Sequence, residues 1–214
     1  YLCVSADSSG PRVTVIDRTT GARVIEDASV GDIIGGSTNS LRVLPVSDKF
    51  LLLGQYSYTL RSVLITPSSG TVGAVTEEAE DISAADDVGF DADSLSDTEW
   101  VAAYRTTPGN EIKVVKGDED GVSATLATIS PGVNPPKNTI AVKVANAPDG
   151  TKRILLAYQR SNTGDVIVYV LSTAGAVVAG PTVLTSADAA NDIYGLTISD
   201  EPAGGTGTAA AAFR

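Results

Sequence analysis

The feature that most constrains this chain of 214 residues is a pattern that recurs about every 50 residues. Apolar runs end in an aromatic residue at Tyr56, Tyr104, Tyr158 and Phe213, with spacings of 48, 54 and 55 residues. A weaker copy, YLCVSA, opens the chain at Tyr1. A unit of this size cannot bury its own apolar faces, so each copy must stack against its neighbours.

After each apolar run the chain turns and continues as an alternating strand that ends in glycine. These glycines, spaced by 49, 51 and 54 residues, are Gly21, Gly70, Gly121 and Gly175. Glycine supplies the positive φ that a tight hairpin turn demands. A third strand follows each glycine, and a fourth precedes each later apolar run, ending at Asp48, Asp97, Asn146 and Asp200. The unit therefore reads as four antiparallel strands joined by hairpins.

Four strands in a unit of about 50 residues are typical of one blade of a β-propeller. We predict an all-β fold, a β-propeller with four-stranded antiparallel blades. The predicted blade units are 39–78, 86–129 and 137–185, with partial units at 1–27 and 191–214. Either the last unit completes the first one and closes a four-bladed ring, or the chain is a segment of a larger propeller, which the unmatched last strand favours. A two-sheet β-sandwich is the alternative fold, although it does not require the period.

Composition excludes several classes of function. The formal net charge of −11 and the isoelectric point near 4.3 would repel nucleic acid and anionic membranes, so we expect neither as a partner. The uncharged apolar runs are too short for a spanning helix, which argues against membrane insertion. The sequence contains no histidine and a single cysteine, Cys3, which excludes Ser-His-Asp and Cys-His catalysis and a thiolate metal cluster.

Two stretches resemble the repeats of secreted and cell-surface β-propellers. They are W-V-A-A-Y-R-x(5)-E-I-K-V-V, from Trp100, and R-I-L-L-A-Y-Q-R-x(4)-D-V-I-V-Y-V-L-S-x-A-G, from Arg153. In such repeats an apolar strand ending in an aromatic is followed by a short loop, an alternating strand and a glycine turn. The resemblance implies an extracellular or cell-surface location. The chain lacks the WD dipeptide, the kelch double glycine and the sialidase box, so the resemblance implies no particular enzyme.

Aromatic and arginine residues recur together near the ends of the apolar runs. The candidate ligand-binding residues are Tyr104, Arg105, Tyr158, Arg160, Phe213 and Arg214. Aromatic faces stack on sugar rings and guanidinium groups bind carboxylates, so such pairs on one rim would suit glycans. The alternative interpretation is that the aromatics belong to the core between blades while the arginines pair with nearby acids.

The acidic segment from Glu77 to Asp97 is the candidate metal site. Calcium takes six to eight oxygen ligands. The candidate ligands are Asp86, Asp87, Asp91, Asp93 and Asp97. The spacing of an EF-hand is missing, so a solvated loop or inner strand is the alternative, and calcium is the only cofactor that the sequence offers.

Three functions follow from these observations. The main hypothesis is a non-enzymatic extracellular or surface module, a rigid scaffold that contacts protein neighbours in a larger assembly. The first alternative is a carbohydrate-binding propeller that uses the rim aromatics and arginines. The second is a carboxylate-based glycoside hydrolase or lyase, which would need only two positioned carboxylates.

Overall fold

A computed structural model gives the arrangement of the chain. It describes residues 1–7, 10–33, 41–79, 89–108, 110–131, 136–161, 163–185, 196–199 and 210–213. Within these residues the elements are β-strands, apart from the short 3-10 helix η1 (Pro67–Ser69). No helix among the described residues is long and apolar enough to cross a membrane.

The strands form successive antiparallel sheets in chain order. The first sheet has the order β1-β2-β3 and consists of β1 (Leu2–Asp7), β2 (Gly10–Ile16) and β3 (Arg23–Ser29). The second consists of β4 (Leu41–Val46), β5 (Lys49–Tyr56), β6 (Thr59–Thr66), β7 (Thr71–Val72) and β8 (Thr76–Ala79), and its outermost position is divided between β7 and β8, which both pair with β6.

The third and fourth sheets each have four strands in an uninterrupted up-and-down order. The third consists of β9 (Phe90–Ser94), β10 (Trp100–Arg105), β11 (Ile112–Asp118) and β12 (Gly121–Ile129). The fourth consists of β13 (Pro136–Asn146), β14 (Lys152–Arg160), β15 (Val166–Ser172) and β16 (Val177–Thr185). A last hairpin pairs β17 (Leu196–Ser199) with β18 (Ala210–Phe213). The prediction of an all-β fold with four-stranded antiparallel sheets is confirmed.

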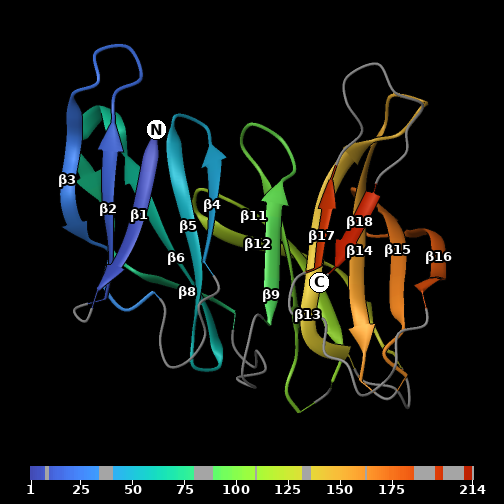
Figure 1. Cartoon of the computed structure of the whole chain (residues 1–214). Coiled ribbons are helices and arrows are strands. Elements are labelled where there is room, and N and C mark those ends of the chain that lie inside the picture. Colours follow the sequence, from blue (N-terminus) through green and yellow to red (C-terminus); the bar gives the residue numbers. More distant parts are fainter. Residues whose placement is uncertain are drawn as a thin grey trace.

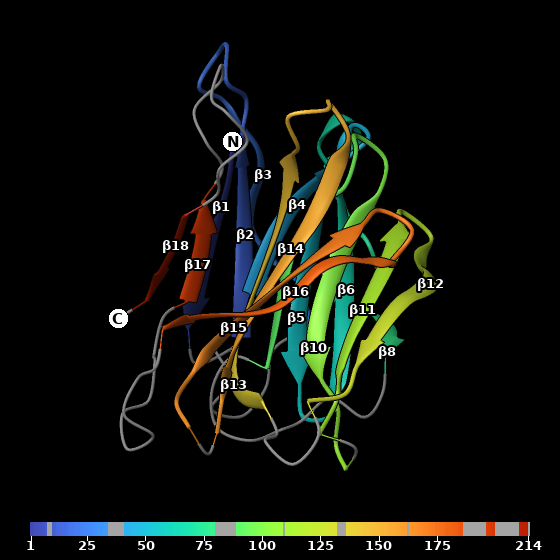
Figure 2. The ribbon, with the colours of Figure 1, turned by 90° about the vertical axis from the view of Figure 1, so that its right-hand side faces the viewer.

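The sheets follow one another in an arc (Figures 1 and 2). The first sheet and the β17–β18 hairpin lie on either side of β9 at the open side of the arc, while β11 and β12 lie on the opposite side. Strands β4, β9 and β13 open their sheets and contact one another in turn, β4 with β9 and β9 with β13. This is the arrangement of blades around the axis of a β-propeller.

Each sheet packs face to face against the next, and this contact forms the core. One cluster joins the first and second sheets through Val13, Val15, Leu52 and Val63. The second and third sheets meet through Leu51, Leu53, Trp100 and Tyr104, and the third and fourth through Val101, Ala103, Leu156 and Tyr158. The central residues of β5, β10 and β14 are buried on both faces, as expected of strands held between two layers.

The strand pairing shows that Tyr56 is not equivalent to Tyr104 and Tyr158, contrary to the prediction from the spacing of the aromatics. Tyr104 and Tyr158 occupy the same position, because Tyr104 pairs with Phe90 and Tyr158 with Ile140, where the continuous pairing with the first strand of each sheet begins. In the second sheet this position belongs to Gly54, which pairs with Leu41 where the pairing of β4 with β5 begins, and β5 continues two residues further to a turn of only two residues. Tyr56 lies two residues further along, at the end of the strand.

The turn glycines behave as the sequence predicts, and they also make contacts that the sequence does not reveal. All four have positive φ, between +66° and +114°. At Gly175 an added methyl group would lie 2.0 Å from the carbonyl oxygen of Leu126, on the outermost strand of the preceding sheet. At Gly121 it would lie 2.7 Å from Oε2 of Glu78, again on the preceding sheet. The hairpin turn of one blade therefore docks against the outer strand of the blade before it.

Candidate functional site

Two of the predicted sugar-stacking rings are buried between sheets. Tyr104 is 3% exposed and Tyr158 is fully buried, with its ring stacked on that of Tyr169 at a centroid distance of 6.3 Å. Burial raises the pKa of the Tyr158 hydroxyl to about 12, with Tyr169 adding to the shift and Arg160 opposing it. The prediction that these two aromatics offer their faces at a rim is wrong, because neighbouring strands already cover both rings.

Two of the predicted arginines brace the loops that follow β10 and β14. Arg105 donates from Nη2 to Oδ1 of Asn110 at 2.6 Å, and burial lowers the pKa of its guanidinium. Arg160 lies 3.8 Å from the carboxylate of Asp165. The two loops are closed by the same kind of backbone hydrogen bond, since Thr106 N donates to Glu111 O in the first loop and Arg160 N donates to Asp165 O in the second. The alternative interpretation, in which core aromatics are accompanied by arginines that pair locally, describes these residues.

The third predicted pair cannot be compared in the same way. Phe213 belongs to β18, of which the backbone is described, and Arg214 lies outside the described residues.

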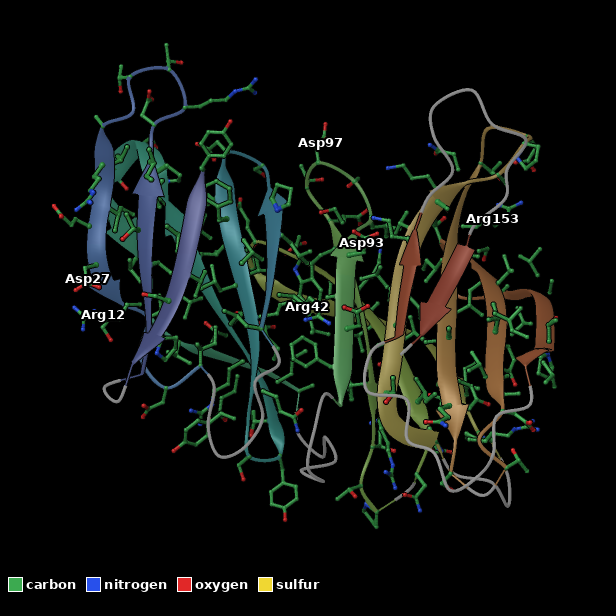
Figure 3. All side chains as sticks on the ribbon, in the orientation of Figure 1. Arg12, Asp27, Arg42, Asp93, Asp97 and Arg153 are labelled. Atoms are coloured by element: carbon green, nitrogen blue, oxygen red, sulfur yellow. The ribbon has the colours of Figure 1, made fainter. Side chains whose placement is uncertain are left out.

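The predicted calcium ligands do not converge where they are described. Asp91 accepts a hydrogen bond from Val142 N at 2.8 Å and pairs with Arg42, while Asp93 accepts from Val144 N at 2.8 Å. Figure 3 shows Asp93 on β9 and Asp97 at the β9–β10 turn. Among the described residues no three acidic side chains form a metal-binding group. Asp86 and Asp87 lie outside the described residues, so a calcium site that includes them stays a prediction.

The side chains of Asp91 and Asp93 have a different role in the structure. Both project from β9 and accept backbone N–H groups of β13, the first strand of the next sheet. Lys143 of β13 lies 3.1 Å from Asp93, and Arg42 of β4 pairs with Asp91 (Figure 3). The two carboxylates therefore connect the first strands of three consecutive sheets.

A different cluster of aromatic and charged side chains lies where β5 turns into β6. The Arg61 guanidinium lies over the Tyr56 ring, 4.2 Å from its centroid. Arg61 Nη2 donates to the Glu77 carboxylate at 2.8 Å, and Nη1 donates to the backbone oxygen of Asp32 at 2.8 Å. We call Tyr56, Arg61 and Glu77, together with the exposed Tyr58 in the adjoining turn, the rim cluster.

Local sequence explains why this cluster forms only in the second sheet among those described. Arg61 pairs across the strands with Gly54, the position that Tyr104 and Tyr158 fill in the next two sheets. Because Gly54 has no side chain, the guanidinium can extend along the strand to Tyr56. The tight turn has a positive φ of 55° at Ser57 and carries the Tyr58 side chain outward, where it is 55% exposed. A glycine in the repeat position of an aromatic, opposite an arginine, is the sequence signal for this site.

The rim cluster offers the groups that recognise a polyhydroxylated ligand. Its guanidinium is fixed by three contacts, so little conformational entropy is lost when a ligand binds. The Glu77 side chain is 56% exposed, and its carboxylate can accept hydrogen bonds from hydroxyl groups. The exposed ring of Tyr58 provides an apolar face for C–H groups. The pairing of Arg61 with Glu77 leaves the cluster close to neutral, which suits a neutral ligand better than an acidic one.

Known structures with a similar fold include a lectin. A variant of Aleuria aurantia lectin in complex with Fucα1-6GlcNAc matches all of this chain and 70% of its own, with 13% identity and a TM-score of 0.59. AofleA from Arthrobotrys oligospora matches 93% of this chain and 56% of its own, with 11% identity and a TM-score of 0.58. The lectin also matches as a complex with α-methyl-L-fucoside, at 14% identity and a TM-score of 0.55. No family model and no curated protein matches the chain in sequence.

Proposed function

We propose that this protein is a glycan-binding β-propeller and that the rim cluster holds a neutral sugar. The observation that carries the proposal is the fixed Arg61 guanidinium, which has an aromatic ring on one side and a half-exposed carboxylate beside it. The similarity to a lectin bound to fucosides supports the class of ligand, although at 13% identity it establishes the fold alone. On this proposal carbohydrate binding replaces the scaffold role as the main function.

The proposed binding mode assigns a part to each member of the cluster. The free edge of Glu77 accepts hydrogen bonds from two neighbouring sugar hydroxyls, while the Arg61 guanidinium donates to a hydroxyl or ring oxygen. The ring of Tyr58 packs against the apolar face of the sugar. Tyr56 does not touch the ligand but holds the guanidinium in place through the cation–π contact. Among its described residues the cluster has a single carboxylate, that of Glu77, and not the pair that glycoside hydrolysis uses. We therefore propose binding without hydrolysis.

The test is a glycan array followed by calorimetry with the sugars that bind. α-Methyl-L-fucoside and Fucα1-6GlcNAc are the first probes, because structures of similar fold contain them. Tyr58→Ala should weaken binding roughly threefold to tenfold, the range expected for one stacking contact. Arg61→Ala should weaken it roughly tenfold to a hundredfold, since bonds to charged groups contribute more.

The matched control is Tyr1→Ala, because Tyr1 is a tyrosine that is 68% exposed and directly precedes β1 of a different sheet. It should leave the affinity unchanged. An array without any bound glycan would refute the proposed function. A glycan that binds equally well to wild type, Tyr58→Ala and Arg61→Ala would keep the function and refute the rim cluster as its site.

A further inference from the structure

The outer strand of the fourth sheet carries an exposed apolar surface. Its four large apolar side chains, each about half exposed, are Val177 (52%), Val178 (53%), Val183 (50%) and Leu184 (49%). We call these four residues, which lie on both faces of this outer strand, the β16 surface. The equivalent strands of the two preceding sheets are more polar, since β8 reads TEEA and β12 alternates Ser and Thr with apolar residues. Outer strands usually carry charge to avoid contact with other chains, so an apolar one indicates a partner.

The preceding sheets show what covers an outer strand in this fold. At each described boundary the hairpin turn between the third and fourth strands of one sheet lies against the outer strand of the sheet before it. The turn glycine marks this contact, because an added methyl group at Gly70 would lie 3.5 Å from Val24 O and one at Gly175 would lie 2.0 Å from Leu126 O. Gly121 and Gly175 are buried by it. The natural cover for the β16 surface is thus another such turn.

The same chain carries one turn of this type that lies against nothing described. It is the turn of the first sheet, residues 17–21, and all five residues are exposed. No described atom lies within 4 Å of a methyl group added at Gly21. The turn is nevertheless well formed, because the Asp17 carboxylate accepts from Thr19 N at 2.9 Å and Thr20 N at 2.7 Å. These bonds lower the pKa of Asp17, so the turn keeps its shape at neutral pH.

One molecule cannot bring these two surfaces together in the arrangement described. Figure 1 shows the first sheet and β16 at opposite sides of the arc. We propose that the chain associates head to tail: the turn 17–21 of one copy docks on the β16 surface of a second copy. The contact repeats between copies the contact that successive sheets already make within the chain. It is heterologous, since different surfaces of the two copies meet.

Net charge makes the proposed association dependent on salt. Each copy carries a formal charge of −11, which opposes approach at long range, whereas the contact joins the apolar β16 side chains to the turn 17–21, which carries one acid and one base and adds no net charge. Salt screens the repulsion between the two copies, so the dimer should tighten as ionic strength rises from about 0.02 M to about 0.3 M. An association driven by ion pairs would weaken over the same range.

The first experiment is sedimentation equilibrium of the whole chain across a concentration series at both salt levels. Wild type should show a reversible, concentration-dependent increase in mass that is larger at high salt. Val178→Asp should weaken the association roughly tenfold or more, because an unpaired charge would be buried in the contact. Val43→Asp is the matched control, a valine 39% exposed on β4, and should leave it unchanged. A monomer at every concentration would overturn the proposal.

The second experiment identifies which surfaces meet. Two single-cysteine proteins, Thr19→Cys and Val178→Cys, are made on a Cys3→Ser background and mixed under oxidising conditions. The proposal expects the disulfide-linked heterodimer to form faster than either homodimer, and faster than the heterodimer of Thr19→Cys with Val43→Cys. A Val178→Cys homodimer that forms fastest would show that two β16 surfaces face each other and would overturn the head-to-tail contact. Circular dichroism of each variant confirms that it is folded.

Discussion

The carboxylate of Asp91 provides the sharpest test of how neighbouring sheets are joined. Its Oδ2 accepts the Val142 N–H at 2.8 Å and its Oδ1 accepts from the Arg42 guanidinium. The Asp91 side chain is 14% exposed and that of Arg42 is 34% exposed. Replacing Asp91 by alanine would therefore leave a backbone donor without its acceptor between two sheets, while the arginine could turn towards water.

The two consequences differ in size. A buried N–H that loses its acceptor costs about 1–3 kcal/mol, and the partly exposed ion pair adds a fraction of 1 kcal/mol. We expect Asp91→Ala to lower the free energy of unfolding by about 2 kcal/mol. Asp91→Asn retains an acceptor oxygen for Val142 N–H and loses only the charge, so it should cost about 1 kcal/mol.

Urea denaturation measures these changes, and amide hydrogen exchange locates them. Val142 N–H should lose about 30-fold in protection in Asp91→Ala, which corresponds to about 2 kcal/mol, while Val144 N–H, held by Asp93, should change less. Asp97→Ala is the control, since Asp97 lies in an exposed turn and its removal should change stability by less than about 0.5 kcal/mol. Equal effects of Asp91→Ala and Asp97→Ala would refute the role given to this carboxylate.

Three further perturbations test other parts of the structure. Gly175→Ala should cost about 3 kcal/mol or more in urea denaturation, since its methyl group would meet a carbonyl oxygen at 2.0 Å, whereas Gly150→Ala, with positive φ but open space, should cost about 1 kcal/mol; equal costs would argue against the docking contact. Because the pKa of Tyr158 is raised in the folded protein, the neutral hydroxyl contributes free energy of unfolding that is fully present below about pH 10 and is lost as pH rises through about 12, by at most about 2 kcal/mol. Tyr158→Phe should reduce this alkaline loss of stability, measured as the urea midpoint at each pH. An unchanged pH profile would contradict the assignment. Trp100 is fully buried and donates from Nε1 to Asp118 O at 2.8 Å, so Trp100→Ala should lower the free energy of unfolding by about 3–5 kcal/mol. A free energy of unfolding within about 1 kcal/mol of wild type, measured by thermal denaturation, would show that the ring is not part of the core.

The architecture was predictable because its determinants are periodic. Apolar runs such as Trp100–Tyr104 are buried on both faces, and such runs recur about every 50 residues, once in each sheet. The turn glycines could be predicted for the same reason, since positive φ restricts the choice of residue. What sequence could not supply was the contact of Gly175 with Leu126, because a close approach between sheets depends on the stacking and leaves no local pattern.

The phase error at Tyr56 shows the limit of the repeat as a guide. The aromatics suggested equivalent positions for Tyr56, Tyr104 and Tyr158, but equivalence is set by strand pairing, and the short turn of the second sheet moves Tyr56 two residues along. A shift of two residues keeps a side chain on the same face of a strand and moves it about 7 Å towards the strand end. Tyr56 therefore leaves the core and reaches the rim.

This shift also explains why the candidate site could not be found by averaging the repeats. The residues that recur in every repeat form the packing contacts between neighbouring sheets. We therefore expect binding groups at positions where one repeat differs from the others. Gly54 in place of a buried tyrosine is such a departure, because the missing side chain leaves space opposite Arg61, whose guanidinium lies over Tyr56. Filling that space by Gly54→Ala should displace the guanidinium and weaken sugar binding while urea stability changes by less than about 1 kcal/mol, whereas a loss of stability with unchanged affinity would indicate that the cluster only supports the fold.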